Sequence, residues 1–169
     1  AELEVLDYGG KVRRISVPDS KGHCENVAVS LDFAKPGFGG SLIGRYANRI
    51  AGGKFKVDGI EYTLPTNIRP DDMPCTLHGG AEGFHDKIWK AEPFKTADGS
   101  DGLILRLKSP DGEGGFPGNL EVKVVYTFSK KNVWTIAWEA ITDKATPVNF
   151  THHVYFNLSG DRRAPVSEH

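Results

Sequence analysis

Two adjacent histidines are the first candidates for chemistry in this sequence. They lie in residues 146–158, TPVNFTHHVYFNL, beside aromatic and amide side chains. Successive strand residues point to opposite faces, so a strand here places His153 and Tyr155 on one face and His152 on the other. An imidazole donates or accepts a proton near neutral pH, and aromatic rings stack on the apolar C–H faces of sugars. The run therefore suits sugar chemistry, and a polar strand at the surface of a sheet is the alternative.

A third histidine, His78, precedes two glycines in the run 77–80, LHGG. Glycine lets the backbone pass close to another group, and here it leaves the imidazole open to a ligand. A histidine that is hydrogen-bonded within its own loop explains the run equally well.

Two long irregular segments separate the regular parts of the chain. Residues 34–53 are rich in glycine and contain Asn48 and Arg49, and residues 65–89 contain His78 and His85. Long ordered loops are uncommon in compact domains and often carry function. These two segments are therefore expected to hold binding residues.

Metal binding is a rival use for the histidines. Because adjacent strand residues face apart, His152 and His153 cannot both ligate one ion, and no compact Cys/His spacing indicates a zinc site. The glycine-rich run 112–118 does not match G-x-G-x-x-G, because Pro117 stands in place of the third glycine. The sequence predicts a turn there and no metal or cofactor site.

The elements that must position these residues are strands. Residues 103–108 and 120–128 alternate apolar and polar side chains, and residues 133–140 follow a polar turn as the next strand of a hairpin. Asp58-Gly59 predicts a second hairpin turn, and residues 11–17 are expected to pair with residues 26–31. No sustained 3.6-residue apolar stripe indicates a helix. The pattern predicts an all-β fold of antiparallel sheets, packed as a sandwich or barrel.

Composition narrows the class of protein further. The chain has 169 residues and a formal net charge of −1, so it lacks the general basic surface of a nucleic-acid-binding protein. No apolar run approaches the ~20 residues that span a bilayer. Two cysteines, Cys24 and Cys75, exclude a disulfide scaffold and are expected to be free thiols.

Taken together, the motifs resemble those of the aldose 1-epimerase (galactose mutarotase) family. The matching runs keep their order along essentially the whole chain. They are residues 44–50 (GRYANRI), 55–59 (FKVDG), 77–80 (LHGG) with Gly83, Phe84 and Trp89, 109–118 (SPDGEGGFPG) and 146–158 (TPVNFTHHVYFNL).

This resemblance implies a galactose mutarotase-like antiparallel β-sandwich that interconverts the anomers of free hexoses such as galactose and glucose, without metal or organic cofactor. By position in its motif, His153 is then the general acid that protonates the ring oxygen. His78 is then the second catalytic histidine, which hydrogen-bonds the sugar and helps to polarise its ring oxygen. Asn48 and Arg49 match the family's substrate-binding pair.

The chain departs from the family pattern in two ways. The residue before the acid histidine is usually Asn but is His152 here, so the reverse assignment of the two histidines stays open. Family members are also considerably longer, and their base glutamate lies in the second half, whereas the last acid here is Glu168. Residues 1–169 are therefore expected to be the N-terminal portion of one sandwich domain, with a missing C-terminal half or a second chain completing it.

Two other functions are compatible with the same residues. A non-catalytic carbohydrate-binding sandwich uses Asn48, Arg49 and His78 for recognition alone. A mutarotase for hexose phosphates needs an anion-binding cluster, for which Arg45 and Arg49 are a small signal. A cytoplasmic location is expected, with a secreted or periplasmic one left open.

Overall fold

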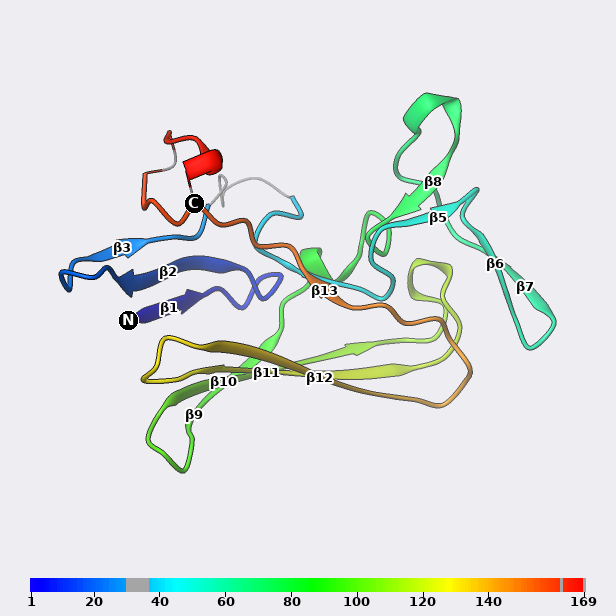
Figure 1. The fold of residues 1–169 in the computed structure, drawn as a ribbon. Coiled ribbons are helices and arrows are strands. Elements are labelled where there is room, and N and C mark those ends of the chain that lie inside the picture. Colours follow the sequence, from blue (N-terminus) through cyan, green and yellow to red (C-terminus); the bar gives the residue numbers. More distant parts are fainter. Residues whose placement is uncertain (30–36, 162, 169) are drawn as a thin grey trace.

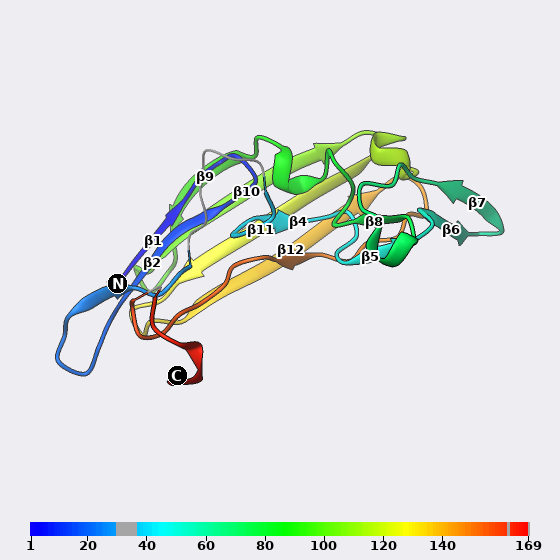
Figure 2. The same ribbon diagram turned by 90° about the horizontal axis from the view of Figure 1, so that it is seen from above.

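The computed structural model describes residues 1–29, 37–161 and 163–168. Antiparallel strands form two main sheets, which lie as separate layers in Figure 1 and overlap when seen from above in Figure 2. The smaller sheet has the strand order β1-β2-β3 and consists of β1 (Glu2–Val5), β2 (Val12–Pro18) and β3 (Cys24–Asn26). The larger has the order β12-β11-β10-β9 and consists of β9 (Lys90–Lys95), β10 (Asp101–Ser109), β11 (Leu120–Phe128) and β12 (Trp134–Thr142).

The larger sheet follows directly from the alternation in the sequence. On β11, Leu120, Val122, Val124 and Tyr126 are buried, whereas the residues between them are exposed or half-buried. The polar turn before Val133 joins β11 to β12 in continuous register, from Phe128 opposite Trp134 to Leu120 opposite Thr142. The predicted hairpin and the all-β fold are confirmed.

The core lies between the two sheets. Val12 and Ile15 of β2 pack in the same cluster as Leu105 of β10 and the inward side chains of β11. Trp89 and Phe84 belong to the same cluster, and the Trp89 indole N–H donates to the Phe84 carbonyl at 3.2 Å. The segment that follows His78 is therefore anchored in the core.

Short two-stranded sheets surround the site-bearing loops. In Figure 1 β5 to β8 lie beyond one end of the sandwich. β13 lies between the sandwich and these strands. The pairs are β4 (Leu42–Ile43) with β13 (Thr151–His152), β5 (Arg49–Ala51) with β8 (Cys75–Leu77), and β6 (Lys54–Val57) with β7 (Ile60–Thr63). The β6–β7 turn at Asp58 and Gly59 is the predicted hairpin.

Two predicted strands are shorter than the sequence suggests. The β2–β3 ladder covers residues 24–26, and the Val27 N–H still donates to the Ile15 carbonyl of β2 at 2.9 Å. Ala28 and Val29 pair instead with residues 155–157. Residues 30 and 31 of the predicted strand lie outside the described residues. Likewise, only Thr151 and His152 of the run 146–158 form a strand, and Ala28 makes an isolated bridge to Phe156.

Helical structure in the described ranges is limited to 3-10 turns, and none of it is long and apolar enough to cross a membrane. The turns are η1 (Pro70–Asp72), η2 (Phe84–Asp86), η3 (Glu113–Gly115) and η4 (Val166–Glu168). Cys24 is exposed and Cys75 is buried, and both are free thiols.

Candidate active site

Backbone pairing brings His153 beside the glycine-rich segment. The last residue pair of the β4–β13 ladder is His152 with Leu42. Beyond it, the His153 N–H donates to the Ser41 carbonyl at 2.8 Å. Its own carbonyl accepts from the Gly40 N–H at 2.7 Å. Residues separated by more than one hundred positions thus form one wall of the site.

Asn48 and His78 hold each other through two reciprocal hydrogen bonds. The His78 N–H donates to the Asn48 carbonyl at 3.0 Å, and the Asn48 N–H donates to His78 Nδ1 at 2.9 Å. Both residues have left-handed backbones, with φ of 64° and 53°. Such conformations are uncommon outside glycine and concentrate at functional sites.

This pairing determines the proton position on His78. Because a backbone N–H can only donate, Nδ1 is the acceptor, and the neutral ring carries its proton on Nε2. Burial lowers the pKa of His78 below its usual value, and the neighbouring His153 and Arg49 lower it further. His78 is therefore suited to act as a neutral hydrogen-bond donor.

The glycines after His78 permit a close backbone approach. A Cβ on Gly79 would lie 1.8 Å from the Gly44 carbonyl oxygen, and one on Gly83 would lie 2.7 Å from the His78 carbonyl oxygen. Gly79 also has φ of 84°. Only glycine fits at these positions, so the spacing of the LHGG run sets the path of the loop.

His78 and His153 face each other at the centre of the site. Their ring centroids are 5.0 Å apart and their planes cross at 87°. Tyr155 contacts the His153 ring at 5.1 Å and is half exposed. The structure thus brings together the two histidines that the sequence singles out, with their rings in edge-to-face contact.

Phe38 is a member of this cluster that sequence reasoning missed. Its ring centroid lies 4.8 Å from that of His78, 4.5 Å from His85 and 6.3 Å from His153. An aromatic residue among the glycines of residues 37–40 was the available signal. The three imidazoles around Phe38 are called the imidazole cluster below.

His85 is the buried member of the imidazole cluster. It is 6% exposed, and its Nδ1 has no hydrogen-bond partner. Burial lowers its pKa to about 4, so the ring is neutral at physiological pH. The described residues contain no group of three or more His, Cys, Asp or Glu side chains placed to hold a metal ion.

His152 points away from the imidazole cluster. Its ring packs against Trp134 at 5.1 Å and Tyr126 at 5.8 Å, and its Nδ1 accepts from the Val154 N–H at 3.2 Å. Burial lowers its pKa to about 4. Of the two adjacent histidines, His153 is the one whose ring lies beside His78.

The two arginines near the site have different surroundings. Arg49 is exposed, and its guanidinium donates to the Asn48 side-chain oxygen at 3.1 Å, which orients both polar groups at the mouth of the site. Arg45 is 2% exposed and bonds inward to protein carbonyls and hydroxyls. Arg49 and Asn48 are therefore the exposed hydrogen-bond donors here, and Arg45 is not.

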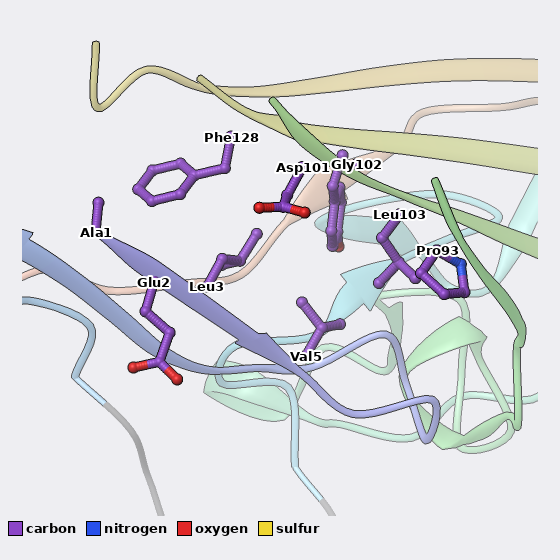
Figure 3. Close-up of a pocket in the computed structure, with 10 residues that line it drawn as sticks. Ala1, Glu2, Leu3, Val5, Pro93, Asp101, Gly102, Leu103 and Phe128 are labelled. Atoms are coloured by element: carbon purple, nitrogen blue, oxygen red, sulfur yellow. The ribbon is translucent and has the colours of Figure 1, made fainter. Parts of the chain in front are cut away.

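A cavity of about 390 Å³ opens elsewhere, between β1 and the β10–β11 pair. Figure 3 shows the apolar lining residues Leu3, Leu103 and Phe128, with the Asp101 carboxylate among them. None of its lining residues belongs to the imidazole cluster.

Fold and site together define an antiparallel β-sandwich protein with histidine, amide and guanidinium groups gathered beyond one end of its core. The family described as aldose 1-epimerase matches residues 1–169. The chain belongs to the aldose 1-epimerase family.

Named relatives agree with this membership. Galactose mutarotase of Homo sapiens is 37% identical over 172 aligned residues, which cover 99% of this chain and 47% of the relative. Aldose 1-epimerase of Escherichia coli is 36% identical, covering 95% and 45%. The crystal structure of galactose 1-epimerase from Lactobacillus acidophilus superposes with a TM-score of 0.77 at 29% identity, covering 92% of this chain and 45% of that one. The chain thus spans about half the length of these relatives.

Proposed function

We propose that this chain supplies the acid and the hexose-binding groups of an aldose 1-epimerase, which interconverts the α and β anomers of free hexoses such as galactose and glucose. The observation that carries the proposal is the meeting of His78 and His153, with ring centroids 5.0 Å apart, beside the exposed pair Asn48 and Arg49. Family membership supports it, as do the names of the human and bacterial relatives.

His153 is the proposed general acid. Its imidazolium donates a proton to the ring oxygen of the sugar while a base removes the proton of the C1 hydroxyl, so the bond between C1 and the ring oxygen breaks and an open-chain aldehyde forms. Rotation about the C1–C2 bond presents the other face of the aldehyde. Reclosure returns each proton to its origin and gives the second anomer.

His78 assists as a neutral donor. Its Nε2–H is available because Nδ1 is occupied by the Asn48 amide, and the lowered pKa disfavours a second positive charge beside His153. A neutral donor polarises the ring oxygen without competing for the transferred proton. Arg49 and Asn48 offer donors, and Asn48 also an acceptor, to the sugar hydroxyls.

The base is proposed to be a glutamate outside this chain, in the additional length that the relatives have. The coverage of 47% of the human relative leaves room for such a residue. Apolar side chains exposed along residues 141–166 support a further part of the protein that covers them. They are Ile141, Val148, Tyr155, Phe156, Leu158 and Val166.

Calorimetry and polarimetry on the 169-residue chain test this proposal. We expect galactose to bind, and the mutarotation of freshly dissolved α-D-galactose to be accelerated about 10²–10⁴-fold less than by a whole relative, because one acid–base partner is absent. Full activity would overturn the assignment of the base, and the absence of hexose binding would overturn the proposed function. Binding with no acceleration at all would favour a carbohydrate-binding module.

A matched pair of variants tests whether the acceleration depends on His153 specifically or on the loss of any histidine. His153→Gln is expected to abolish the residual acceleration while the fold is retained, whereas His23→Gln, at an exposed histidine, is expected to change neither rate nor binding. Equal acceleration of glucose and glucose 6-phosphate by the chain would revive the sugar-phosphate alternative.

A cytoplasmic location is a separate proposal. Its support is the two free thiols, one of them exposed, since disulfides form mainly in oxidising compartments. Fractionation of the source cells tests it, and recovery outside the cytoplasm would contradict it.

A further inference from the structure

Arg45 is a fully hydrogen-bonded cation in the interior behind the site. Its guanidinium donates to Ser109 Oγ at 2.9 Å and to the carbonyls of Ser109, Pro110 and Pro117 at 2.8, 2.9 and 2.9 Å. A fifth bond of 3.5 Å reaches Thr146 Oγ1. The five N–H groups of arginine thus all have acceptors, but none of these acceptors carries a charge.

The negative charge nearest to this network belongs to Glu113. Its carboxylate accepts a hydrogen bond from the Ser109 hydroxyl, which itself accepts from Arg45 Nε. The other carboxylate oxygen lies 2.7 Å from Lys87 Nζ. The Glu113 and Lys87 side chains are only 18% and 24% exposed, so solvent screens the charges weakly.

The two cations come from the two segments that form the site. Arg45 lies three residues before Asn48, and Lys87 ends the loop that begins at His78. These segments also touch directly, because Gly79 packs on the Gly44 carbonyl and the Phe84 N–H donates to the same carbonyl at 3.3 Å. The loop of residues 109–117 therefore lies behind both segments and is bonded to each.

We propose that Glu113 is a positioning residue of the site: its carboxylate, held between Ser109 and Lys87, is the counter-charge that keeps the Arg45 segment and the His78 loop in register. The inference deepens the proposed function and rests on it for its consequence for sugar binding. It also gives the glycine-rich run 112–118 a role, since Gly112 and Gly114, with φ of 81° and 59°, bracket Glu113 and turn its side chain inward.

Charge, in addition to shape, is what this role requires. A buried cation is costly to desolvate, and removal of its partner leaves that cost uncompensated. Burial lowers the pKa of Arg45, and the Glu113 carboxylate is the largest opposing influence. An uncharged side chain of the same size at position 113 keeps the packing but leaves Arg45 and Lys87 without a carboxylate between them.

Hydrogen exchange on the full 169-residue chain tests the proposal with Glu113→Gln. The Asn48 and His78 amides report the reciprocal pair at the site, and the Val124 amide on the central strand β11 reports global unfolding. We expect amide exchange at Asn48 and His78 to become about tenfold faster relative to Val124. The reason is that Arg45 and Lys87 lose the carboxylate between them, and the free-energy cost of a buried polar group without its partner favours local opening of the two segments. Glu121→Gln is the control, since Glu121 pairs with Lys108 at the same 2.7 Å but on the exposed face.

A merely structural role predicts a different result. Exchange at Asn48, His78 and Val124 would then rise together in Glu113→Gln, and that outcome, or equal effects of Glu113→Gln and Glu121→Gln, would overturn the proposal. If Glu113→Gln fails to fold, Lys87→Met takes its place, with the same selective loss expected at His78. Exchange needs no sugar, so a selective effect in a chain that binds no hexose would refute the proposed function and leave the positioning role in place.

Discussion

The core around His152 and the imidazole cluster around Phe38 both place histidine rings against aromatic rings, but their composition differs. The cluster gathers three imidazoles around one phenyl ring, whereas His152 lies among indole and phenol rings. His152 is enclosed by Trp134 and Tyr126 between the sheets, and its pKa is lowered to about 4. His153, the next residue, faces His78 in a partly open cluster. One peptide unit separates a histidine kept neutral by burial from one whose ring lies beside His78 and Phe38.

The comparison shows that residue type alone does not define a catalytic histidine. In the core, desolvation disfavours the charged ring, and the Val154 amide occupies Nδ1. In the cluster, His78 also has its Nδ1 occupied by an amide, but its ring meets the His153 imidazole, with centroids 5.0 Å apart, in place of an indole and a phenol. The neighbouring side chains distinguish the two settings.

The largest expected effect is a loss of stability in the core between the sheets. Leu105→Ala removes a fully buried side chain between the sheets and is expected to lower the free energy of unfolding by about 2–5 kcal/mol. Ile141→Ala on β12 of the same sheet is the control, because Ile141 is 76% exposed, and its effect is expected to be small. Chemical denaturation measures both. Equal losses would show that the Leu105 side chain is not part of the core.

An intermediate effect concerns acid sensitivity. The His152 pKa is about 4 in the folded chain against about 6.5 when unfolded, so the unfolded state binds the proton first as the pH falls. Stability from this group is complete above pH ~6.5 and is lost towards pH ~4, by about 3 kcal/mol in all. His152→Phe is expected to flatten the fall in stability over this range, at a cost at neutral pH of about 1–3 kcal/mol for the unpaired Val154 amide.

The matched control for that experiment is Tyr126→Phe. It removes the hydroxyl that donates to the Gly10 carbonyl at 3.3 Å but keeps the His152 ring and its burial. The acid slope, followed by denaturation at several pH values, is therefore expected to match that of the parent chain. A slope unchanged in His152→Phe would contradict the assignment of this titration to the core histidine.

The smallest expected effect lies in the imidazole cluster. Phe38→Ala removes the ring that contacts His78 and His85, so water reaches both and their lowered pKa values are expected to rise towards the ordinary value. The stability cost is expected to be on the order of 1 kcal/mol, because the ring is only partly buried. NMR titration of the imidazole signals measures the shifts. Phe94→Ala, at a half-buried ring on β9, is the control, and comparable shifts there would remove the special role of Phe38.

Much of the fold is predictable from sequence because it is local. The alternation of residues 120–128 and the polar turn before Val133 define a hairpin whose partners are close along the chain. The β4–β13 pair joins residues more than one hundred positions apart, and its two-residue strands carry no periodic signal. Of the predicted strand at residues 26–31, Ala28 and Val29 pair with residues 155–157 and not with β2, because this tertiary contact redirects the backbone.

The residues of the candidate site also fall into a group that is recognisable from the sequence and a group that is not. The types and spacing of His78, Asn48 and Arg49 are visible in the sequence, and so is the need for glycine after His78. Phe38 is not recognisable from the sequence as a member of the site, because its contacts with His78 and His85 join distant segments of the chain. The ion pair of Glu113 with Lys87 likewise forms only in the tertiary structure.

By itself, the sequence determined the all-β class, the larger sheet and the residue types available for sugar chemistry, because side-chain alternation and turn chemistry act between near neighbours. Only the tertiary structure decided which of two adjacent histidines meets His78 and which is enclosed in the core. The physical reason is that desolvation and hydrogen-bond partners depend on what surrounds a ring in space. For His152 and His153 those surroundings come from strands and loops distant in the chain.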